Sequence, residues 1–313
     1  MKVRTTLVLC SLALLCGCQK TQLAEDLIAP KTLDSDFWMA FTPTGDQMVE
    51  RGRVDINRRV PVDDEVMIDV SVIRAKPAGD RKKSLGTALI LHNFRENKTN
   101  YPYQGAGERL TKKGYDVVLP DLRAHGRSDG QYVTYGVKEK NDLKRIMDIL
   151  ISQKLVSPDV YVFGSNYGAT VAIQYAAIDP HVKGVLAIAP YKDFRSLAEQ
   201  SLKLKLRSDE DIEDIIVEAG RIGDFDPDEA SAVGAAPKLN CPILLVHGLI
   251  NPTVPMAHSE EILAVAPEPK ELIVPAAEQF IMPAILEDWI ADRLEELAQK
   301  GVQKTAPPLS AAK

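Results

Sequence analysis

The stretch Val160–Ala176, VYVFGSNYGATVAIQYA, predicts a strand, a tight turn and a helix in immediate succession. Its first four residues are β-branched or aromatic and favour a strand. Gly164 and Gly168 flank the turn, and the small residues that follow suit a helix packed closely against a sheet. Asn166 stands at the centre of the turn, where asparagine tolerates a positive φ better than most residues other than glycine.

Further short apolar runs on both sides of this stretch predict a parallel sheet. Strands that are covered on both faces read as continuous apolar runs, and here helical stretches such as 136–153 and 283–299 alternate with them. Segment 65–75 alternates polar and apolar residues and predicts an antiparallel edge strand. The sequence therefore predicts an α/β fold with a mostly parallel central sheet and helices on both faces. The apolar runs are 86–94, 115–122, 159–164, 184–190 and 242–248.

The first residues predict export. A basic start, the apolar run Leu7–Leu15 and small residues before Cys18 are typical of a signal peptide at 1–17, and the run is too short to span a bilayer. The residues Leu15-Cys16-Gly17-Cys18 resemble the bacterial lipobox. That resemblance implies acylation of Cys18 and a lipid anchor at the cell envelope, with the outer membrane favoured by Gln19 if the cell is Gram-negative. An ordinary cleaved signal with a chance cysteine is the alternative.

The composition excludes several partners. Removing the signal peptide takes away Lys2 and Arg4 and changes the net charge from −6 to −8. An acidic chain without a basic cluster is not expected to bind nucleic acid.

Segment 224–235 begins like a calcium loop, but Glu229 and Ala235 replace the required glycine and glutamate. We therefore expect neither a metal nor a cofactor.

After the signal peptide, the chain divides into three predicted parts. Residues 18–35 are expected to be a tether between the lipid and the folded domain, which spans 36–300. Within that domain, the polar, helix-rich insertion 195–236 predicts a helical cap over the end of the sheet where ligands bind. The small and proline-rich segment 301–313 predicts a disordered tail.

Five landmarks in sequence order resemble the α/β-hydrolase superfamily, most closely its monoacylglycerol lipase and serine aminopeptidase branch. The similarity covers roughly residues 60–298. It implies the α/β-hydrolase fold with a small helical cap, a nucleophile elbow at 164–168 and an oxyanion loop at Asn93 and Phe94. The landmarks are LILHNF (89–94), PDLRAHGRSDG (120–130), GSNYG (164–168), PILLVHGLINPTVP (242–255) and ELIVPAAEQF (271–280).

The resemblance places all three positions of the family's catalytic triad on carboxamides. The nucleophile position holds Asn166, the acid position Asn251 and the base position Gln279. Serine-type hydrolysis needs a hydroxyl, a base with a pKa near neutrality and a carboxylate that orients that base. None of these three side chains supplies such a group, so we expect no catalytic residues at these positions.

The leading hypothesis is a catalytically inactive α/β-hydrolase-like lipoprotein that binds a small ligand or an envelope protein. Its pocket would consist of Asn93, Phe94, Asn166 and Tyr167, with the N–H groups of Phe94 and Tyr167 holding a carbonyl or carboxylate of the ligand.

Two alternatives remain. The first is a serine-type ester or peptide hydrolase with a non-standard arrangement, such as Ser165 with Asp193. The second is a purely structural or interaction role, in which the surface of the cap or the C-terminal helix binds another envelope protein. Turnover that depends on Ser165 would support the first alternative. Capture of a partner protein that depends on residues 195–236 would support the second.

Overall fold

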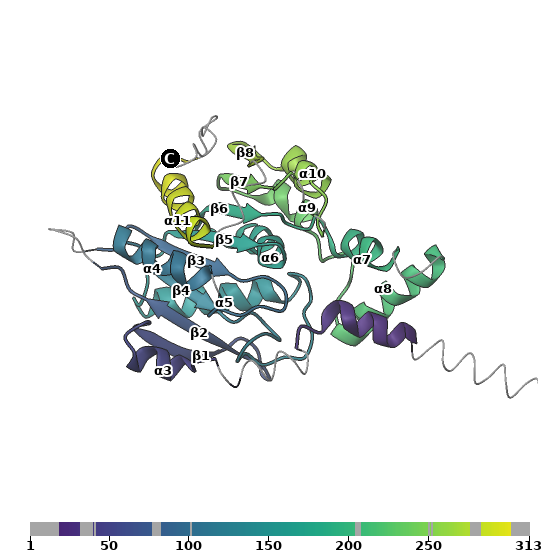
Figure 1. The fold of residues 1–313 in the computed structure, drawn as a ribbon, viewed down its shortest axis with the longest axis horizontal. Coiled ribbons are helices and arrows are strands. Elements are labelled where there is room, and N and C mark those ends of the chain that lie inside the picture. The colour runs from purple at the N-terminus through teal and green to yellow at the C-terminus, as the bar shows by residue number, and fades with distance from the viewer. Residues whose placement is uncertain are drawn as a thin grey trace, which may run out of the picture.

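The computed structural model describes residues 19–31, 40, 42–76, 83–100, 102–203, 208–249, 251, 253–275 and 283–301. Eight strands form its centre (Figure 1). They are β1 (Ile56–Pro61), β2 (Met67–Ile73), β3 (Thr87–Leu91), β4 (Asp116–Pro120), β5 (Val160–Ser165), β6 (Val182–Ile188), β7 (Ile243–Val246) and β8 (Lys270–Ile273).

The strands form one sheet in the order β1-β2-β4-β3-β5-β6-β7-β8. β3 to β8 are mutually parallel, whereas β2 is antiparallel to both of its neighbours. The predicted mostly parallel α/β sheet is confirmed. The prediction that segment 65–75 forms an edge strand is wrong, because β1 pairs with the outer side of β2. The alternating pattern reports which faces of a strand are buried, but it does not report whether another strand lies beyond it.

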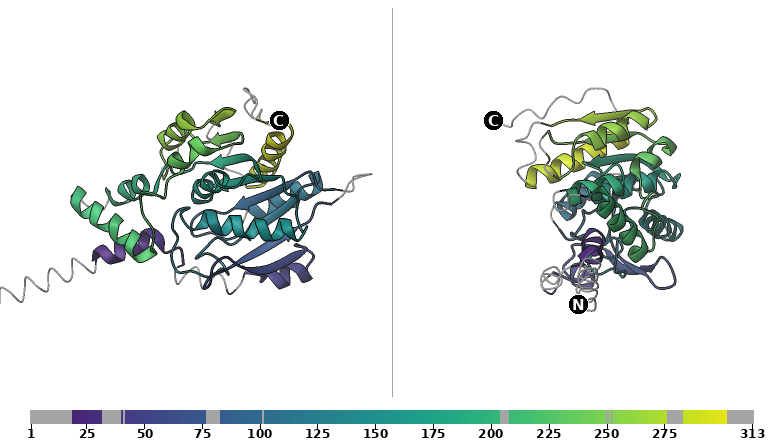
Figure 2. Two further views of the ribbon diagram at one scale, coloured as in Figure 1. Left: turned by 180° about the vertical axis from the view of Figure 1, so that it is seen from behind. Right: turned by 90° about the vertical axis from the view of Figure 1, so that its right-hand side faces the viewer.

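Helices cover both faces of this sheet (Figure 2). α4 and α11 pack on one face and on each other, and α5, α6 and α10 lie on the opposite face. The helices are α3 (Gly45–Glu50), α4 (Tyr103–Lys113), α5 (Glu139–Ser152), α6 (Tyr167–Ala176), α7 (Phe194–Lys203), α8 (Asp209–Gly223), α9 (Ala232–Ala235), the 3₁₀ turn η1 (Ala236–Lys238), α10 (Ala257–Val265) and α11 (Pro283–Lys300).

The alternation of side chains along each strand divides the core in two. Leu89 and Leu91 of β3 belong to the core under α5, α6 and the cap, whereas Ala88 and Ile90 belong to the core under α4 and α11. Since all four are buried, β3 reads in the sequence as a continuous apolar run. The carboxyl ends of these parallel strands carry the candidate site.

Residues 19–28 form a helix that lies across α8 of the cap (Figure 1, purple). Ala24 and Ile28 have no exposed surface and join the core beneath the cap. Lys20 forms ion pairs with Asp211 and Asp214 of α8, at 2.6 and 2.7 Å. The expectation of a tether over 18–35 therefore does not hold for residues 19–31. The sequence offers no local signal for this docking, since the partners of the helix are almost 200 residues away.

The same segment also contacts the rim of the candidate site. The hydroxyl of Tyr135 donates a hydrogen bond to the carbonyl of Leu27 at 2.7 Å, and the N–H of Val133 donates to the carbonyl of Ile28 at 2.9 Å. The guanidinium of Arg95 donates to the carbonyl of Asp26 at 3.3 Å. The N-terminal segment thus connects the cap to two loops of the sheet domain.

Replacing Ile28 by alanine is expected to lower the free energy of unfolding by about 2–4 kcal/mol, because it removes buried methyl groups and leaves a cavity. Urea unfolding of the purified protein measures this loss. Ile178→Ala is the matched control, because that side chain is 37% exposed and its truncation should change stability little. Equal effects of the two changes would show that the N-terminal helix does not pack as described.

Several predicted segments lie outside the described residues: the signal peptide 1–17, the lipidation site Cys18 and the tail after residue 301. In the part of the chain that the structure does describe, no helix combines the length and the apolar character that crossing a membrane requires.

Candidate functional site

The turn between β5 and α6 places Asn166 at the carboxyl edge of the sheet. Its backbone has φ 46° and ψ −104°, a conformation that residues other than glycine rarely adopt. The N–H of Asn166 donates to the carbonyl of Ile188 at 2.8 Å, and its own carbonyl accepts the N–H of Thr170 at 3.0 Å. The backbone therefore has the sharp strand-to-helix geometry expected of an elbow, with a carboxamide at its tip.

The two flanking glycines are required by close backbone approaches. A Cβ atom on Gly164 would lie 2.3 Å from the carbonyl oxygen of Gly168, and one on Gly168 would lie 2.5 Å from the carbonyl oxygen of His92. Real Cβ atoms do not approach backbone atoms so closely. The glycines thus bring the start of α6 against the end of β3, where the loop with Asn93 and Phe94 begins.

The side chain of Asn93 occupies the two N–H groups that were expected to bind a ligand. Its Oδ1 accepts the N–H of Phe94 at 2.7 Å and the N–H of Tyr167 at 3.3 Å. Because a hydrogen-bond donor needs an acceptor, this pair of contacts also fixes which branch of the carboxamide is the oxygen. The expectation that these two N–H groups are open to a carbonyl or carboxylate is therefore wrong for this structure.

The backbone of Asn93 is held on both sides. Its N–H donates to the hydroxyl of Tyr103 at 3.1 Å, and its carbonyl accepts a hydrogen bond from Nδ1 of His92 at 2.8 Å. Nε2 of His92 accepts the N–H of Leu122 at 2.9 Å, so both ring nitrogens are used. The hydroxyl of Tyr103 donates in turn to the carboxylate of Glu96. The loop therefore holds Asn93 at one place above the elbow.

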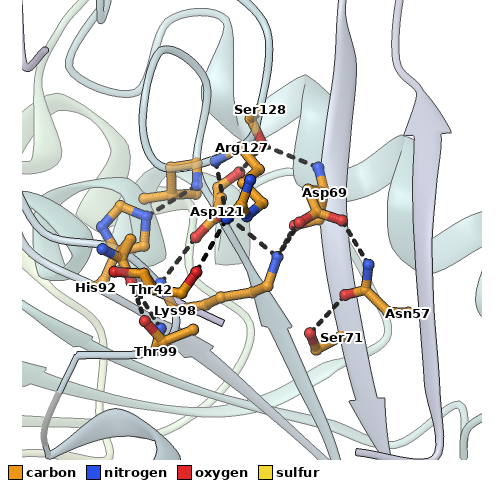
Figure 3. A network of polar contacts seen from close by, with 12 residues as sticks. Thr42, Asn57, Asp69, Ser71, His92, Lys98, Thr99, Asp121, Arg127 and Ser128 are labelled. Carbon is orange, nitrogen blue, oxygen red and sulfur yellow. Dashed lines mark hydrogen bonds and ion pairs between the residues drawn. The ribbon is translucent and has the colours of Figure 1, made fainter. Parts of the chain in front are cut away.

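A buried ion-pair network fixes the far end of this loop (Figure 3). The ammonium of Lys98 lies between the carboxylates of Asp69 and Asp121, at 2.5 and 3.1 Å, and all three side chains are at most 3% exposed. Asp121 also accepts the N–H of Lys98 at 2.8 Å, and Asp69 accepts Nδ2 of Asn57 at 2.8 Å. The network joins the loop to β2 and to the end of β4.

Of the two other carboxamides of the predicted triad, the structure describes Asn251, which serves its own turn. Oδ1 of Asn251 accepts the N–H groups of Thr253 and Val254, both at 2.9 Å, and so stabilises its own turn. Gln279 lies outside the described residues. Among the residues that are described, no hydrogen bond joins Asn251 to Asn166, and the Asn166 carboxamide itself has no partner there.

The alternative arrangement of Ser165 with Asp193 receives no support from the geometry. Oδ1 of Asp193 accepts the N–H of Ser196 at 2.7 Å, which places the carboxylate at the start of α7 as a helix cap. The side chain of Ser165 lies near Tyr103 of α4, which belongs to the core on the opposite face of the sheet from α6. The two side chains thus serve different parts of the fold.

Aromatic rings continue from the elbow to the cap, and only the first of them, Phe94, was expected in the site from the sequence. The ring of Phe94 stacks on Tyr135 with the centroids 6.2 Å apart, and Tyr135 lies 4.7 Å from Phe194 of α7. Phe194 in turn contacts Phe225 at 5.4 Å. Burial raises the pKa of Tyr191, a further neighbour of Tyr135, to about 12, so its hydroxyl stays protonated. Tyr135, Tyr191 and Phe194 are buried, so the accessible rings of this largely apolar wall are Phe94 and Phe225.

Two histidines beneath this wall are buried and neutral. Burial lowers the pKa of His92, an effect that Lys98 reinforces and Asp121 opposes. Burial also lowers the pKa of His125 well below its usual 6.5, with His92 and Lys31 acting in the same direction. His92 is hydrogen-bonded through both nitrogens, whereas His125 donates Nδ1–H to the carbonyl of Arg123 and its Nε2 has no partner among the described residues. No hydrogen bond joins either ring to Asn166 in that part of the chain.

These two histidines predict a dependence of stability on pH. A histidine whose pKa is lower in the folded state stabilises the fold fully above its unfolded pKa of about 6.5, and this stability is lost as the pH falls. We expect the free energy of unfolding to drop by at least about 1–1.5 kcal/mol between pH about 7.5 and about 6, because burial also lowers the pKa values of His247 and His258. Urea unfolding in both buffers measures it, and a flat profile would contradict the assignment. The comparison ends at pH about 6 because burial raises the pKa of Asp142 to about 6. Protonation of Asp142 below that pH would increase the stability of the fold and so oppose the effect of the histidines.

One group of side chains among the described residues could approach a metal ion. Ligand atoms of Asp148, Asp179 and His181 lie within 4.8 Å of one another. However, Asp179 already accepts hydrogen bonds from the hydroxyl of Tyr175 at 2.6 Å and from His181, and Asp148 pairs with Lys144 at 3.0 Å. The group is satisfied as a network at the C-terminal ends of α5 and α6, whereas Asn166 precedes the N-terminus of α6.

The sheet order, the elbow and the loop above it can now be compared with known proteins. A family model described as serine aminopeptidase, S33, matches residues 82–209, which include Asn93 and Asn166 but stop before Asn251. The match covers less than half of the chain. The predicted α/β-hydrolase fold is confirmed, and the predicted resemblance to the α/β-hydrolase superfamily is confirmed over the matched residues.

Solved structures agree in fold. An esterase from Pyrococcus furiosus is 23% identical with a TM-score of 0.60, and the alignment covers 77% of this chain and 90% of that one. Est1E from Butyrivibrio proteoclasticus, solved with ferulic acid, is 16% identical with a TM-score of 0.59, covering 76% and 98%. A serine hydrolase homologue from Coxiella burnetii is 17% identical with a TM-score of 0.52, covering 77% and 98%. At these identities the likeness concerns the fold alone.

A curated relative is also similar in sequence. The uncharacterized protein YqkD of Bacillus subtilis (strain 168) is 24% identical over 167 residues, which is 51% of this chain. The match spans about half of that relative, 54% of its length.

Proposed function

We propose that this α/β-hydrolase-like protein does not hydrolyse esters or peptides and instead binds a small ligand or a protein partner at the elbow. The observation that carries this proposal is the residue at the elbow tip. The backbone of Asn166 has the strained conformation of a nucleophile, but its carboxamide has neither a hydroxyl nor a thiol to attack with. The scaffold is therefore kept while the reacting group is absent.

The environment of the elbow supports binding rather than chemistry. Oδ1 of Asn93 accepts the N–H groups of Phe94 and Tyr167, the pair that would stabilise a developing oxyanion. The carboxylate of Asp193 caps the start of α7. No described histidine is hydrogen-bonded toward Asn166. The solved neighbours that are named esterases share the fold at identities below 25%, so their activity is not carried over.

We further propose that the protein acts at the cell envelope as an exported lipoprotein anchored through Cys18. The motivation is the signal-like start and the lipobox-like residues before Cys18. Metabolic labelling with palmitate tests this part, and incorporation that persists in Cys18→Ala would contradict it.

The purified protein is expected to show no hydrolysis of short- and medium-chain p-nitrophenyl esters above the rate of a matched Asn166→Ala variant. Loss of a nucleophile alone lowers kcat by on the order of 10⁶ in serine proteases, so residual turnover should be undetectable. Turnover that survives purification and disappears in Ser165→Ala would overturn the proposal and support the hydrolase alternative.

A further inference from the structure

The most unusual contact of the site is the convergence of two backbone N–H groups on one side-chain oxygen. Oδ1 of Asn93 lies 2.7 Å from the nitrogen of Phe94 and 3.3 Å from the nitrogen of Tyr167. Tyr167 is the first residue of α6, so this oxygen also faces the positive end of a ten-residue helix. An oxygen in this place is where a bound carbonyl, carboxylate or oxyanion would be stabilised.

The contact is fixed by the surroundings of Asn93. Its backbone N–H and carbonyl are both hydrogen-bonded, to Tyr103 and His92, and the close approach of Gly168 to His92 sets the distance between the loop and α6. A ligand anion could reach the two N–H groups only if the Asn93 side chain rotated away. That rotation would exchange two satisfied hydrogen bonds for two others, so the internal oxygen competes with any ligand oxygen.

With Oδ1 committed, the carboxamide groups left to a ligand are neutral. The guanidinium of Arg95 lies 5.2 Å from the centroid of the Phe94 ring and donates a hydrogen bond to the carbonyl of Asp26. Asn93 has Nδ2 remaining as a donor, and Asn166 has a half-exposed carboxamide that offers both a donor and an acceptor. The ring of Phe94, half-exposed and backed by Tyr135, lies beside them. An uncharged amide complements these carboxamides, and an alkyl chain attached to it would pack against the aromatic wall.

We propose that Asn93 is the specificity-determining residue of this site: it acts as an internal ligand of the oxyanion-type N–H pair, excludes anionic ligands and selects an uncharged amide attached to an apolar chain. This inference rests on the proposed function, since it concerns what the elbow binds. Asn93 would thus determine which class of ligand binds, and it would take no part in a reaction.

Octanoate and octanamide test the inference, because they share one chain and differ in charge. Each is titrated into the ¹⁵N-labelled protein while the amide resonances of Phe94 and Tyr167 are followed. The native protein should bind octanamide at least tenfold more tightly than octanoate and leave both resonances in place. In Asn93→Gly, octanoate should bind at least tenfold more tightly than to the native protein and shift both resonances.

Asn93→Asp is the matched control, because a carboxylate of the same shape can still accept both N–H groups and should continue to exclude octanoate. Octanoate that shifts both resonances of the native protein, or fails to shift them in folded Asn93→Gly, would overturn the exclusion by Asn93. Failure of octanamide to bind the native protein would overturn the assigned ligand class. Ester turnover by the native protein would instead refute the proposed function, and it would leave the octanoate comparison to decide the role of Asn93.

Discussion

Replacing Asn166, Asn251 and Gln279 by serine, aspartate and histidine is expected to restore little ester hydrolysis unless Asn93 is replaced by glycine as well. The three changes supply a nucleophile, an orienting acid and a base. They leave Oδ1 of Asn93 on the N–H groups of Phe94 and Tyr167, where the oxyanion of the tetrahedral intermediate must bind. Removal of oxyanion stabilisation typically costs 10²–10³ in kcat.

The fourfold variant should therefore exceed the threefold variant by about 10²–10³ in kcat, with a smaller change in KM, because the hole stabilises the transition state more than the substrate. Steady-state kinetics on p-nitrophenyl butyrate measure the difference. The threefold variant with Asn93→Asp serves as the control, since its side chain can still fill the hole. Equal activity of the threefold and fourfold variants would show that Asn93 moves aside without cost.

Lys98→Met is expected to lower the free energy of unfolding by about 3–5 kcal/mol, the cost of removing one partner from a buried ion pair. The ammonium of Lys98 compensates two carboxylates, Asp69 and Asp121, whose side chains are each 3% exposed. Without it, two negative charges remain buried a short distance apart. Methionine has a similar length and keeps the apolar packing, so the loss reports the charge (Figure 3).

Urea unfolding at constant ionic strength measures this loss. Lys144→Met is the matched control, because Lys144 pairs with Asp148 on the surface of α5 with both side chains more than one third exposed. Surface pairs at this spacing contribute about 0.3–0.5 kcal/mol. A loss for Lys98→Met no larger than for Lys144→Met would mean that the network of Figure 3 is not formed in solution.

The elements that the sequence predicted well are those whose signal is local. The strands β3 to β7 read as apolar runs, because residues on both faces of a central strand are buried. The elbow was readable because Gly164 and Gly168 are the residues that its close backbone contacts require. β1, by contrast, has mostly half-exposed or exposed residues, so it has no apolar run and was missed.

The sequence predicted which residue types occupy the candidate site, but it did not predict the hydrogen bonds between them. The carboxamides at Asn166 and Asn251 could be placed by the resemblance of their flanking motifs to those of the family. Whether Asn93 would leave its neighbouring N–H groups open depends on a side-chain rotamer and on a residue 74 positions later, which no local pattern reports. The aromatic wall brings together Phe94, Tyr135 and Phe194, which are likewise separated in the sequence.

By itself, the sequence determined an α/β sheet with an elbow and the carboxamide at its tip, because burial patterns, glycines and the nature of a side chain are local properties. Only the tertiary structure decided that residues 19–28 pack on the cap, that Lys98 lies between two aspartates and that Asn93 fills the oxyanion-type pair. Each of these joins segments that are distant in the chain. Their free energies come from desolvation and hydrogen-bond geometry, which are set when the elements pack together.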